Sequence, residues 1–510
     1  MSDRLDAAAV IARRHRAVRW RRRAAALLLA APLFALGSAA GDELLAESAE
    51  AALVRTRLRA LLAPRPAATW VGLLVVDAET HETWFAQQPD LLLKPASVMK
   101  LFVTAAAIEH LGADFRFETS VHARDSELWI IGGGDPALGD ERIAQRNGQP
   151  RTEFYDAVAR ALLARGIRSI DKIVLDDSVF DRNWRHDDWP DSEATAWYQA
   201  PVGGLNFNDN CLDSRIELRD GRVRLILQPD LPRSFVRNQL VRGPKHAPRV
   251  DRRGDGDVFE FQGTVSRSAA IGPVAVRRPT LFFGHALRVA LEARGVEVRG
   301  EIVRRKIANE ALRAEPPIVI RATPLEDLLW RCNTFSQNLF AECLIKALAA
   351  YADDGTRLPV SGTWERGTAS LRSTLEKMGL DVDHAVFRDG SGLSHHNRVT
   401  ARQVVNLLSV MRRHASADLF VNSLAAPAEP GTLRRRYDEP ELRGSLRGKT
   451  GTLSGVRALA GYISRPDGTQ LAFALLINGT NEAALPLRVC RILVGAQPDP
   501  PRDRHSRAAP

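Results

Sequence analysis

Lysine is scarce in this chain of 510 residues, although positive charge is abundant. Lys and Arg together number 71, and only 8 of them are lysines. An arginine does not give up its proton in a protein, whereas a buried lysine can. The few lysines are therefore the places to look for an amine that acts as a base. Two of them, Lys100 and Lys449, fall in short motifs described below.

Cysteine is also rare, and no cysteine has the spacing of a zinc ligand. We therefore predict no metal site and no cofactor. We interpret the adjacent His395 and His396 as loop residues, because nothing completes a set of metal ligands around them. An oxidising compartment would allow three full disulfide pairings, and a buried, unpaired state is an equal alternative for Cys332 and Cys343. The four cysteines are Cys211, Cys332, Cys343 and Cys490.

The chain has no internal repeat, no nucleotide-binding glycine loop and, beyond its N-terminus, no apolar run that predicts a membrane span. The N-terminus has the pattern of a secretory signal: residues 13–23 are strongly basic, residues 24–36 are apolar, and Ser38-Ala39-Ala40 follows. This pattern predicts a signal peptide over residues 1–40, export to the periplasm, and no membrane span after cleavage. Residues 497–510 are rich in Pro and Arg and are predicted to be disordered.

The charge balance argues against nucleic acid as a partner. The formal net charge is +10, but residues 1–40 contain eight arginines and two acidic residues, a net +6. Removing that segment leaves the mature chain at +4. Such a charge predicts no binding to nucleic acid and only mild attraction to an anionic cell wall or membrane surface.

The most informative motif is Ser97-Val98-Met99-Lys100. A serine attacks an amide only if a base takes its proton, and a lysine one helical turn later lies on the same helix face. Pro95 and Gly112 are typical of the first turn and the end of a helix, so a helix is predicted between them. Free backbone N–H groups in its first turn would favour an oxyanion at Ser97. The residues expected to face the core are Val98, Leu101, Phe102, Ala105 and Ile108.

The spacing S-x-x-K is weak by itself, because it occurs again at Ser169 and Lys172. That second copy leads into the apolar run 173–175, which predicts a strand, so we interpret it as accidental. Taken alone, the first copy would more readily be a helix with a solvated serine and an incidental lysine. The sequence Lys449-Thr450-Gly451 is expected only about 0.02 times by chance at this lysine content, so it carries most of the statistical weight.

A second motif, Ser336-Gln337-Asn338, lies between apolar residues. This setting predicts hydroxyl and amide groups that point into a cleft rather than a surface loop. Ser336 could then relay a proton, and Asn338 could fix the lysine and a substrate amide. The alternative is an ordinary helix N-cap without a catalytic role.

The third motif, Lys449-Thr450-Gly451-Thr452, precedes two apolar runs, 456–463 and 471–477, that are separated by a turn at 466–468. We predict a hairpin with the motif on its first strand. Gly451 would let a substrate backbone approach closely. The ammonium group of Lys449 would attract a substrate carboxylate, and its charge, together with burial, would help to keep Lys100 neutral.

With these motifs in order, the chain resembles the class C low-molecular-mass penicillin-binding proteins, the serine D-alanyl-D-alanine carboxypeptidases and endopeptidases of peptidoglycan. The resemblance covers roughly residues 65–495. The departures are small: Lys94 replaces a usually apolar residue, and Gln337 fills the variable position of the second motif. The matching blocks are 94–102, 133–136, 177–180, 200–201 with 205–208, 336–342, 389–394 and 449–453.

The resemblance implies an α/β (α+β) fold with a penicillin-binding, serine β-lactamase-like catalytic domain, an antiparallel sheet with helices, built from residues 42–117 and 313–496. Between Ser97 and Ser336 lie 238 residues. The resemblance explains them by a large, mostly-β insertion at 118–312, with a nested subdomain at about 208–268. Within the insertion, the residues predict strands at 128–131, 173–175, 216–218 and 223–227, and one helix at 281–295.

The resemblance also implies a reaction on peptidoglycan stem peptides, in which a serine attacks the carbonyl between two D-alanines and water then cleaves the acyl-enzyme. β-Lactam antibiotics would acylate the same serine. The implied roles are nucleophile for Ser97, base for Lys100, proton shuttle and substrate orientation for Ser336 and Asn338, oxyanion binding for the backbone N–H groups of Ser97 and Thr452, and binding of the terminal carboxylate for Lys449 with Thr450 or Thr452.

Two alternatives stay open, and one of them is not an enzyme. A serine β-lactamase shares the three motifs, although the large insertion argues against it. A catalytically silent peptidoglycan-binding scaffold is the other, and the intact Ser97, Lys100 and Lys449 argue against that. Carboxypeptidase and endopeptidase activity are both compatible with the motifs, as are any diamino acid in the stem and any oligomeric state.

Overall fold

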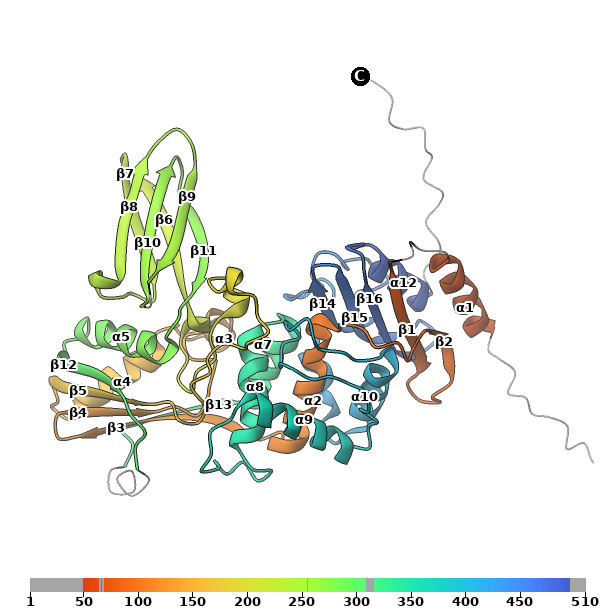
Figure 1. Cartoon of the computed structure of the whole chain (residues 1–510), viewed down its shortest axis with the longest axis horizontal. Coiled ribbons are helices and arrows are strands. Elements are labelled where there is room, and N and C mark those ends of the chain that lie inside the picture. Colours follow the sequence, from red (N-terminus) through yellow and green to blue (C-terminus); the bar gives the residue numbers. More distant parts are fainter. Residues whose placement is uncertain (1–48, 64–65, 67, 255, 309–315, 496–510) are drawn as a thin grey trace, which may run out of the picture. The chain divides into compact units, whose positions relative to one another are not determined.

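The computed structural model describes residues 49–63, 66, 68–254, 256–308 and 316–495. The predicted signal peptide (1–40) and C-terminal tail (497–510) lie outside these ranges. The described chain contains two five-stranded and two three-stranded sheets (Figure 1). No helix within the described ranges is both long and apolar enough to cross a membrane.

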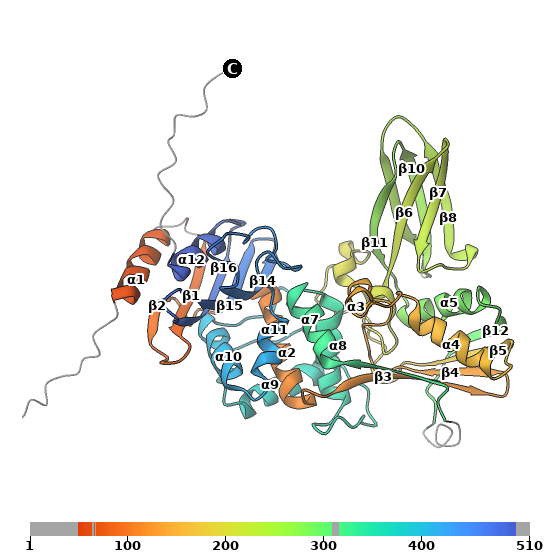
Figure 2. The same cartoon turned by 180° about the vertical axis from the view of Figure 1, so that it is seen from behind.

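The first sheet is antiparallel and is covered on both faces. Its strands, in pairing order, are β14 (Leu446–Leu453), β15 (Val456–Ser464), β16 (Gln470–Asn478), β1 (Trp70–Asp77) and β2 (Thr83–Gln87). Because side chains alternate along a strand, Leu73 and Val75 of β1 join the core under α1 (Ala49–Leu61) and α12 (Leu485–Val494). Leu74 and Val76 join the opposite core, which includes α10 (Ala401–Arg413). Figures 1 and 2 show these two helical layers.

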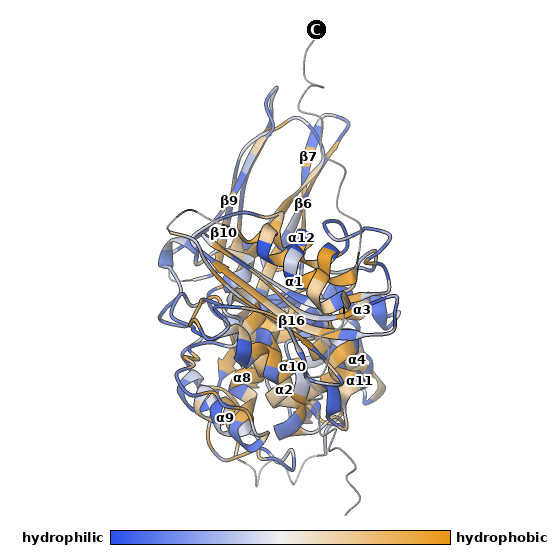
Figure 3. Cartoon of the chain, turned by 90° about the vertical axis from the view of Figure 1, so that its right-hand side faces the viewer, coloured by the Kyte–Doolittle hydropathy of each residue, from blue (hydrophilic) through white to orange (hydrophobic). Residues whose placement is uncertain are grey.

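A helical layer next to the first sheet carries the first two motifs. It contains α2 (Met99–Leu111), α7 (Leu325–Thr334), α8 (Asn338–Ala350), α9 (Trp364–Lys377) and α11 (Ala417–Ser423). The predicted helix is confirmed: a 3-10 turn, η1 (Ala96–Val98), runs into α2, whose C-cap is Gly112. All five residues expected in the core are buried, but so are Lys100 and Thr104. Figure 3 shows how apolar the sheet around β16 and helix α8 are.

The second sheet brings crossover helices into the insertion, which is otherwise mostly β as predicted. In pairing order its strands are β12 (Glu297–Arg304), β5 (Ser169–Asp176), β4 (Glu127–Ile131), β3 (Arg116–Arg124) and β13 (Val319–Pro324). Strands β4, β5 and β12 are parallel. Parallel strands need a crossover, usually a helix. Here α3 (Glu141–Arg146) and α4 (Glu153–Ala164) join β4 to β5, and α5 (Pro279–Glu292) precedes β12. The prediction of a single helix was therefore wrong, although α5 itself is confirmed.

Two small sheets within the insertion share one apolar core, and their last strand ends at Ala275, beyond the predicted subdomain bounds of about 208–268. One sheet pairs β11 (Ala269–Ala275), β6 (Cys211–Arg219) and β7 (Arg222–Gln228), and the other pairs β8 (Val236–Arg242), β10 (Val258–Val265) and β9 (Ala247–Arg253). All four predicted insertion strands lie within β4, β5, β6 and β7. The predicted return to the catalytic domain at residue 313 lies outside the described residues, and β13 still pairs with β3.

Candidate active site

Ser97 and Lys100 meet where the turn η1 runs into α2. The Nζ atom of Lys100 lies 3.0 Å from Ser97 Oγ, 2.8 Å from Asn338 Oδ1 and 2.8 Å from the Ser391 carbonyl oxygen. Ser97 is partly exposed, whereas the Lys100 side chain is fully buried. The structure thus brings the first two motifs together around one amine.

These three contacts suit both forms of the lysine, because an ammonium group can donate to all three oxygens and a neutral amine to two of them. A neutral amine has two N–H groups and one lone pair, and the oxygens of Asn338 and Ser391 can only accept a hydrogen bond. The lone pair is then left for the hydroxyl proton of Ser97, which is the arrangement that a general base needs. Burial lowers the pKa of Lys100 to about 8, although Cys332, Glu342 and Asp389 act in the opposite direction. Lys100 can therefore be deprotonated near neutral pH.

The second motif lies between α7 and α8. Gln337 is the N-cap of α8, so the N-cap alternative describes Gln337 correctly, while its two neighbours face polar partners. Asn338 donates from Nδ2 to the Tyr198 carbonyl oxygen at 2.8 Å, which leaves Oδ1 turned toward Lys100. Ser336 has a left-handed backbone (φ 61°), and its Oγ accepts a hydrogen bond from Lys449 Nζ at 2.8 Å.

The third motif occupies its own strand, which corrects the predicted hairpin. Lys449 to Thr452 lie on β14, an edge strand that pairs with β15, and β15 and β16 form the hairpin that follows. The Lys449 side chain is fully buried, while Thr450 is partly exposed and Thr452 is exposed. Burial and then Lys100 lower the pKa of Lys449 well below its ordinary value, so the predicted coupling of the two lysines acts on Lys449.

Two glycines hold the nucleophile turn in place. A Cβ atom on Gly451 would lie 2.7 Å from the Pro95 carbonyl oxygen. A Cβ atom on Gly392, whose φ is 82°, would lie 1.9 Å from the Ala96 carbonyl oxygen. Either side chain would displace the turn that carries Ser97. The close approach at Gly451 is thus made by the protein's own backbone, and contact of Gly451 with a substrate stays a prediction.

A cleft of about 560 Å³ opens above these groups. One wall comes from the catalytic elements and contains Ser97, Ser336, Asn338, Thr450 and Thr452. The other wall comes from the long insertion and contains Pro190, Glu193, Trp197 and Tyr198. The insertion therefore takes part in the site rather than standing apart from it.

The structure also places the second S-x-x-K copy, the four cysteines and His395. Ser169 and Lys172 are on β5, where Lys172 forms an ion pair with Glu127 at 3.2 Å, so the second S-x-x-K copy is a strand, as predicted. All four cysteines are buried and unpaired, and none of the three possible disulfide pairings is formed. His395 lines the cleft from the turn after Leu393. Among the described residues, no group of three or more His, Cys, Asp or Glu side chains could hold a metal ion.

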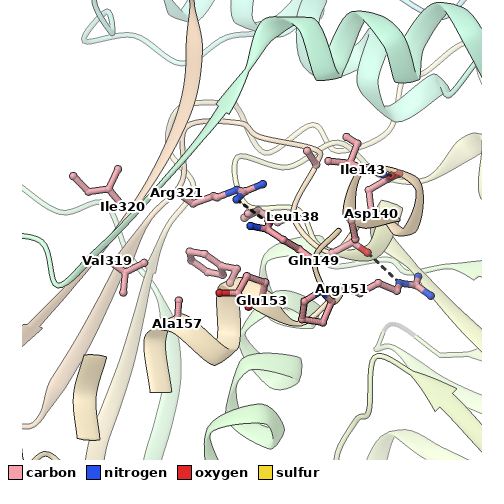
Figure 4. Close-up of a pocket in the computed structure, with 15 residues that line it drawn as sticks. Leu138, Asp140, Ile143, Gln149, Arg151, Glu153, Ala157, Val319, Ile320 and Arg321 are labelled. Carbon is pink, nitrogen blue, oxygen red and sulfur yellow. Dashed lines mark hydrogen bonds between the residues drawn. The ribbon is translucent and has the colours of Figure 1, made fainter. Parts of the chain in front are cut away.

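A second, smaller cavity of about 220 Å³ lies between α3, α4 and β13 (Figure 4). Arg321 reaches into it and donates to Gln149 Oε1 at 3.4 Å. Arg151 lies on its other side and donates to the Gly139 carbonyl oxygen. This cavity contains no residue of the three motifs, so the chemistry belongs to the larger cleft.

Sequence reasoning gave no role to three residues at this site. The Ser391 carbonyl is a direct partner of Lys100, and Glu342 and Asp389 are fully buried close by. All three fall in the matching blocks 336–342 and 389–394, so the resemblance to the family already marked the segments in which they lie. Only the folded chain shows that these two blocks meet at Lys100.

Comparison with known proteins shows which family the chain matches. The model of the D-Ala-D-Ala carboxypeptidase 3 (S13) family matches residues 54–492. The chain is 31% identical over 500 residues to a D-alanyl-D-alanine carboxypeptidase of Actinomadura sp. (strain R39), covering 92% of this chain and 89% of that protein. It is 24% identical over 433 residues to the D-alanyl-D-alanine carboxypeptidase DacB of Haemophilus influenzae, covering 81% and 86%.

A solved structure shows the same fold. The crystal structure of penicillin binding protein 4 (dacB) from Haemophilus influenzae superposes with a TM-score of 0.69 at 23% identity, covering 86% of this chain and 98% of that one. The same protein complexed with a β-lactam has a TM-score of 0.65.

Proposed function

The chain belongs to the D-Ala-D-Ala carboxypeptidase (S13) family, and we propose that Ser97 is its nucleophile and Lys100 its general base. Its function is that of a serine-type D-Ala-D-Ala carboxypeptidase of peptidoglycan metabolism. The observation that carries the residue assignment is the contact of the buried Lys100 amine with Ser97 Oγ at 3.0 Å. The contacts of Lys100 with Asn338 and Ser391 orient its lone pair toward Ser97.

The reaction follows from these contacts. Lys100 takes the hydroxyl proton as Ser97 Oγ bonds to the carbonyl carbon between two D-alanines, and the backbone N–H groups of Ser97 and Thr452 bind the oxyanion. The C–N bond then breaks, and the proton passes to the departing amine of D-alanine. Ser336 contacts Lys449 and faces the same cleft, so it is placed to relay that proton. In the second half of the reaction, water attacks the carbonyl carbon of the acyl-enzyme and gives up a proton to the base. The ester bond then breaks, and Ser97 Oγ regains its proton.

The free carboxylate of the terminal D-alanine would bind at β14. The Thr450 and Thr452 side chains line the cleft and can donate hydrogen bonds to it. Lys449 is buried behind them and donates to Ser336 Oγ and to the Thr450 carbonyl oxygen, both at 2.8 Å. Its positive charge would act from behind this wall, and a bound anion would favour the charged form.

Endopeptidase cleavage of cross-linked stems is the second candidate, because the insertion wall gives the cleft additional surface beyond Ser97. We expect the purified mature enzyme to release D-alanine from pentapeptide muropeptides and to open D-Ala cross-links more slowly. Chromatography and mass spectrometry of both product sets measure the balance. A protein that neither acylates with penicillin nor releases product from either substrate would instead be a catalytically silent scaffold.

We also propose that the enzyme acts in the periplasm. The basic and apolar segments of residues 1–40 support export to the periplasm with cleavage near Ala40. Cleavage there would leave the carboxypeptidase in the compartment that holds peptidoglycan. We expect N-terminal sequencing of the exported protein to begin close to Gly41, and a mature form that starts at Met1 would contradict this proposal.

A further inference from the structure

We propose that Glu342 is a positioning residue: it holds the backbone at Ser391 against Lys100 and so keeps the lone pair of the Lys100 amine directed at Ser97. Asp389 supports the same turn. This inference rests on the proposed role of Lys100 as the base. It assigns a function to two buried carboxylates that contact neither Ser97 nor the cleft.

Glu342 accepts hydrogen bonds from the two peptide groups that flank Gly390. Its Oε1 accepts from the backbone N–H of Ser391 at 2.8 Å, and its Oε2 accepts from the N–H of Gly390 at 3.0 Å. The Trp364 indole N–H donates to Oε2 at 2.7 Å. The carbonyl of the same Ser391 accepts from Lys100 Nζ at 2.8 Å. One residue thus links the buried carboxylate to the base.

Asp389 shapes the same turn from its other side. It accepts from the backbone N–H groups of Gly392 and Ser394 at 2.8 and 2.6 Å, and from Asn397 Nδ2 at 2.8 Å. The Trp189 indole N–H, which belongs to the long insertion, donates to Asp389 Oδ2 at 2.9 Å. The insertion therefore supports the turn that presents its carbonyl to Lys100.

The hydrogen bonds favour the ionised form of Glu342. Every partner named above is an N–H donor, so a carboxylate satisfies them all, whereas a proton on either oxygen would find no acceptor among them. Burial and then Asp389 raise the pKa of Glu342 above its ordinary value, although its hydrogen bonds to Ser391, Trp364 and Gly390 act in the opposite direction. We favour the carboxylate because three donors converge on it.

The negative charge of Glu342 also affects the pKa of Lys100. Glu342 and Asp389 act on Lys100 as anions that favour the protonated amine. The other titratable groups that face Lys100 are Cys332, whose pKa burial raises to about 11, and Lys449. Removing the charge of Glu342 should therefore lower the pKa of Lys100, because a nearby anion stabilises the ammonium form.

The test is the pH dependence of acylation by a fluorescent penicillin in the mature protein. In the wild type, acylation should rise with pH around a midpoint of about 8, as Lys100 loses its proton. For Glu342→Gln we expect the midpoint to move to lower pH by about 0.5–1 unit and the plateau rate to fall about tenfold. Glu342→Asp keeps the charge, so its midpoint should stay close to that of the wild type while its rate falls.

A matched control is Asp177→Asn, another buried carboxylate, which pairs with Arg304 and Thr280 away from the cleft. Its midpoint should not move. If Glu342→Gln does not fold by circular dichroism, Asp389→Asn takes its place and should give a shift in the same direction. A folded Glu342→Gln protein with a lower acylation rate but an unchanged pH midpoint would overturn the proposal. A wild type without a pH-dependent limb would instead overturn the role of Lys100 itself.

Discussion

Ser97→Ala should abolish covalent labelling by a fluorescent penicillin. Alanine has no hydroxyl group, so no ester can form, whatever else in the cleft is intact. The fold should change little, because Ser97 is partly exposed and loses one hydrogen bond, worth about 1 kcal/mol, with Lys100. Gel fluorescence of the wild type and the variant, with a thermal melt of each, measures both effects.

The chain contains its own control for this experiment. Ser169 begins the second S-x-x-K copy, but it starts strand β5, and its Lys172 is occupied by Glu127. Ser169→Ala should therefore label like the wild type. In the wild type, peptide mapping should place the label on the peptide that bears Ser97. Label that persists in Ser97→Ala would mean that another serine is the nucleophile.

The motif residues could be predicted because the reaction restricts their chemistry. Of the two long cationic side chains, only lysine can lose its proton and act as a base, whereas arginine cannot. The helical spacing places Lys100 on the same helix face as Ser97. The predicted helix and the pairing of Ser97 with Lys100 both appear in the structure. Their catalytic roles stay predictions, which the variants described here test.

The supporting residues could not be predicted, because their role depends on contacts between distant segments. Glu342 lies 242 positions after Lys100, and it acts through the backbone of Ser391 rather than through a side chain. No spacing rule reports that a carbonyl will face an amine. The same holds for Tyr198, whose carbonyl orients Asn338.

The errors in the fold have a physical cause as well. Helix α4 has apolar residues at helical spacing, Phe154, Val158 and Leu162, and these are buried. That helical spacing was present in the sequence, but 281–295 was the one helix predicted within the mostly-β insertion. The crossover helices become necessary only once β4 and β5 are known to be parallel, which is a property of the folded sheet.

The two lysines of the site should respond differently to arginine, because the mechanism requires different properties of them. Lys100 must lose a proton, which arginine does not do, so Lys100→Arg should slow acylation by about 10²–10⁴-fold. Its wider guanidinium would also have to fit where the amine now contacts Ser97, Asn338 and the Ser391 carbonyl. We therefore expect almost no labelling at any pH between about 6 and about 9, a range that spans the lowered pKa of about 8 for Lys100.

Lys449 needs only to supply positive charge behind β14, so Lys449→Arg should keep measurable activity. The side chain is fully buried, so the larger head group would cost about 1–3 kcal/mol of folding stability. The misfit would also shift β14 against the cleft, and a displacement of about 1 Å would slow acylation by up to about 100-fold. The loss should be greater for pentapeptides with a free terminal carboxylate than for cross-linked stems cut internally. Pre-steady-state acylation and muropeptide hydrolysis by both variants measure this difference. Equal losses in the two variants would show that Lys449 also takes part in proton transfer, and an active Lys100→Arg enzyme would show that the base lies elsewhere.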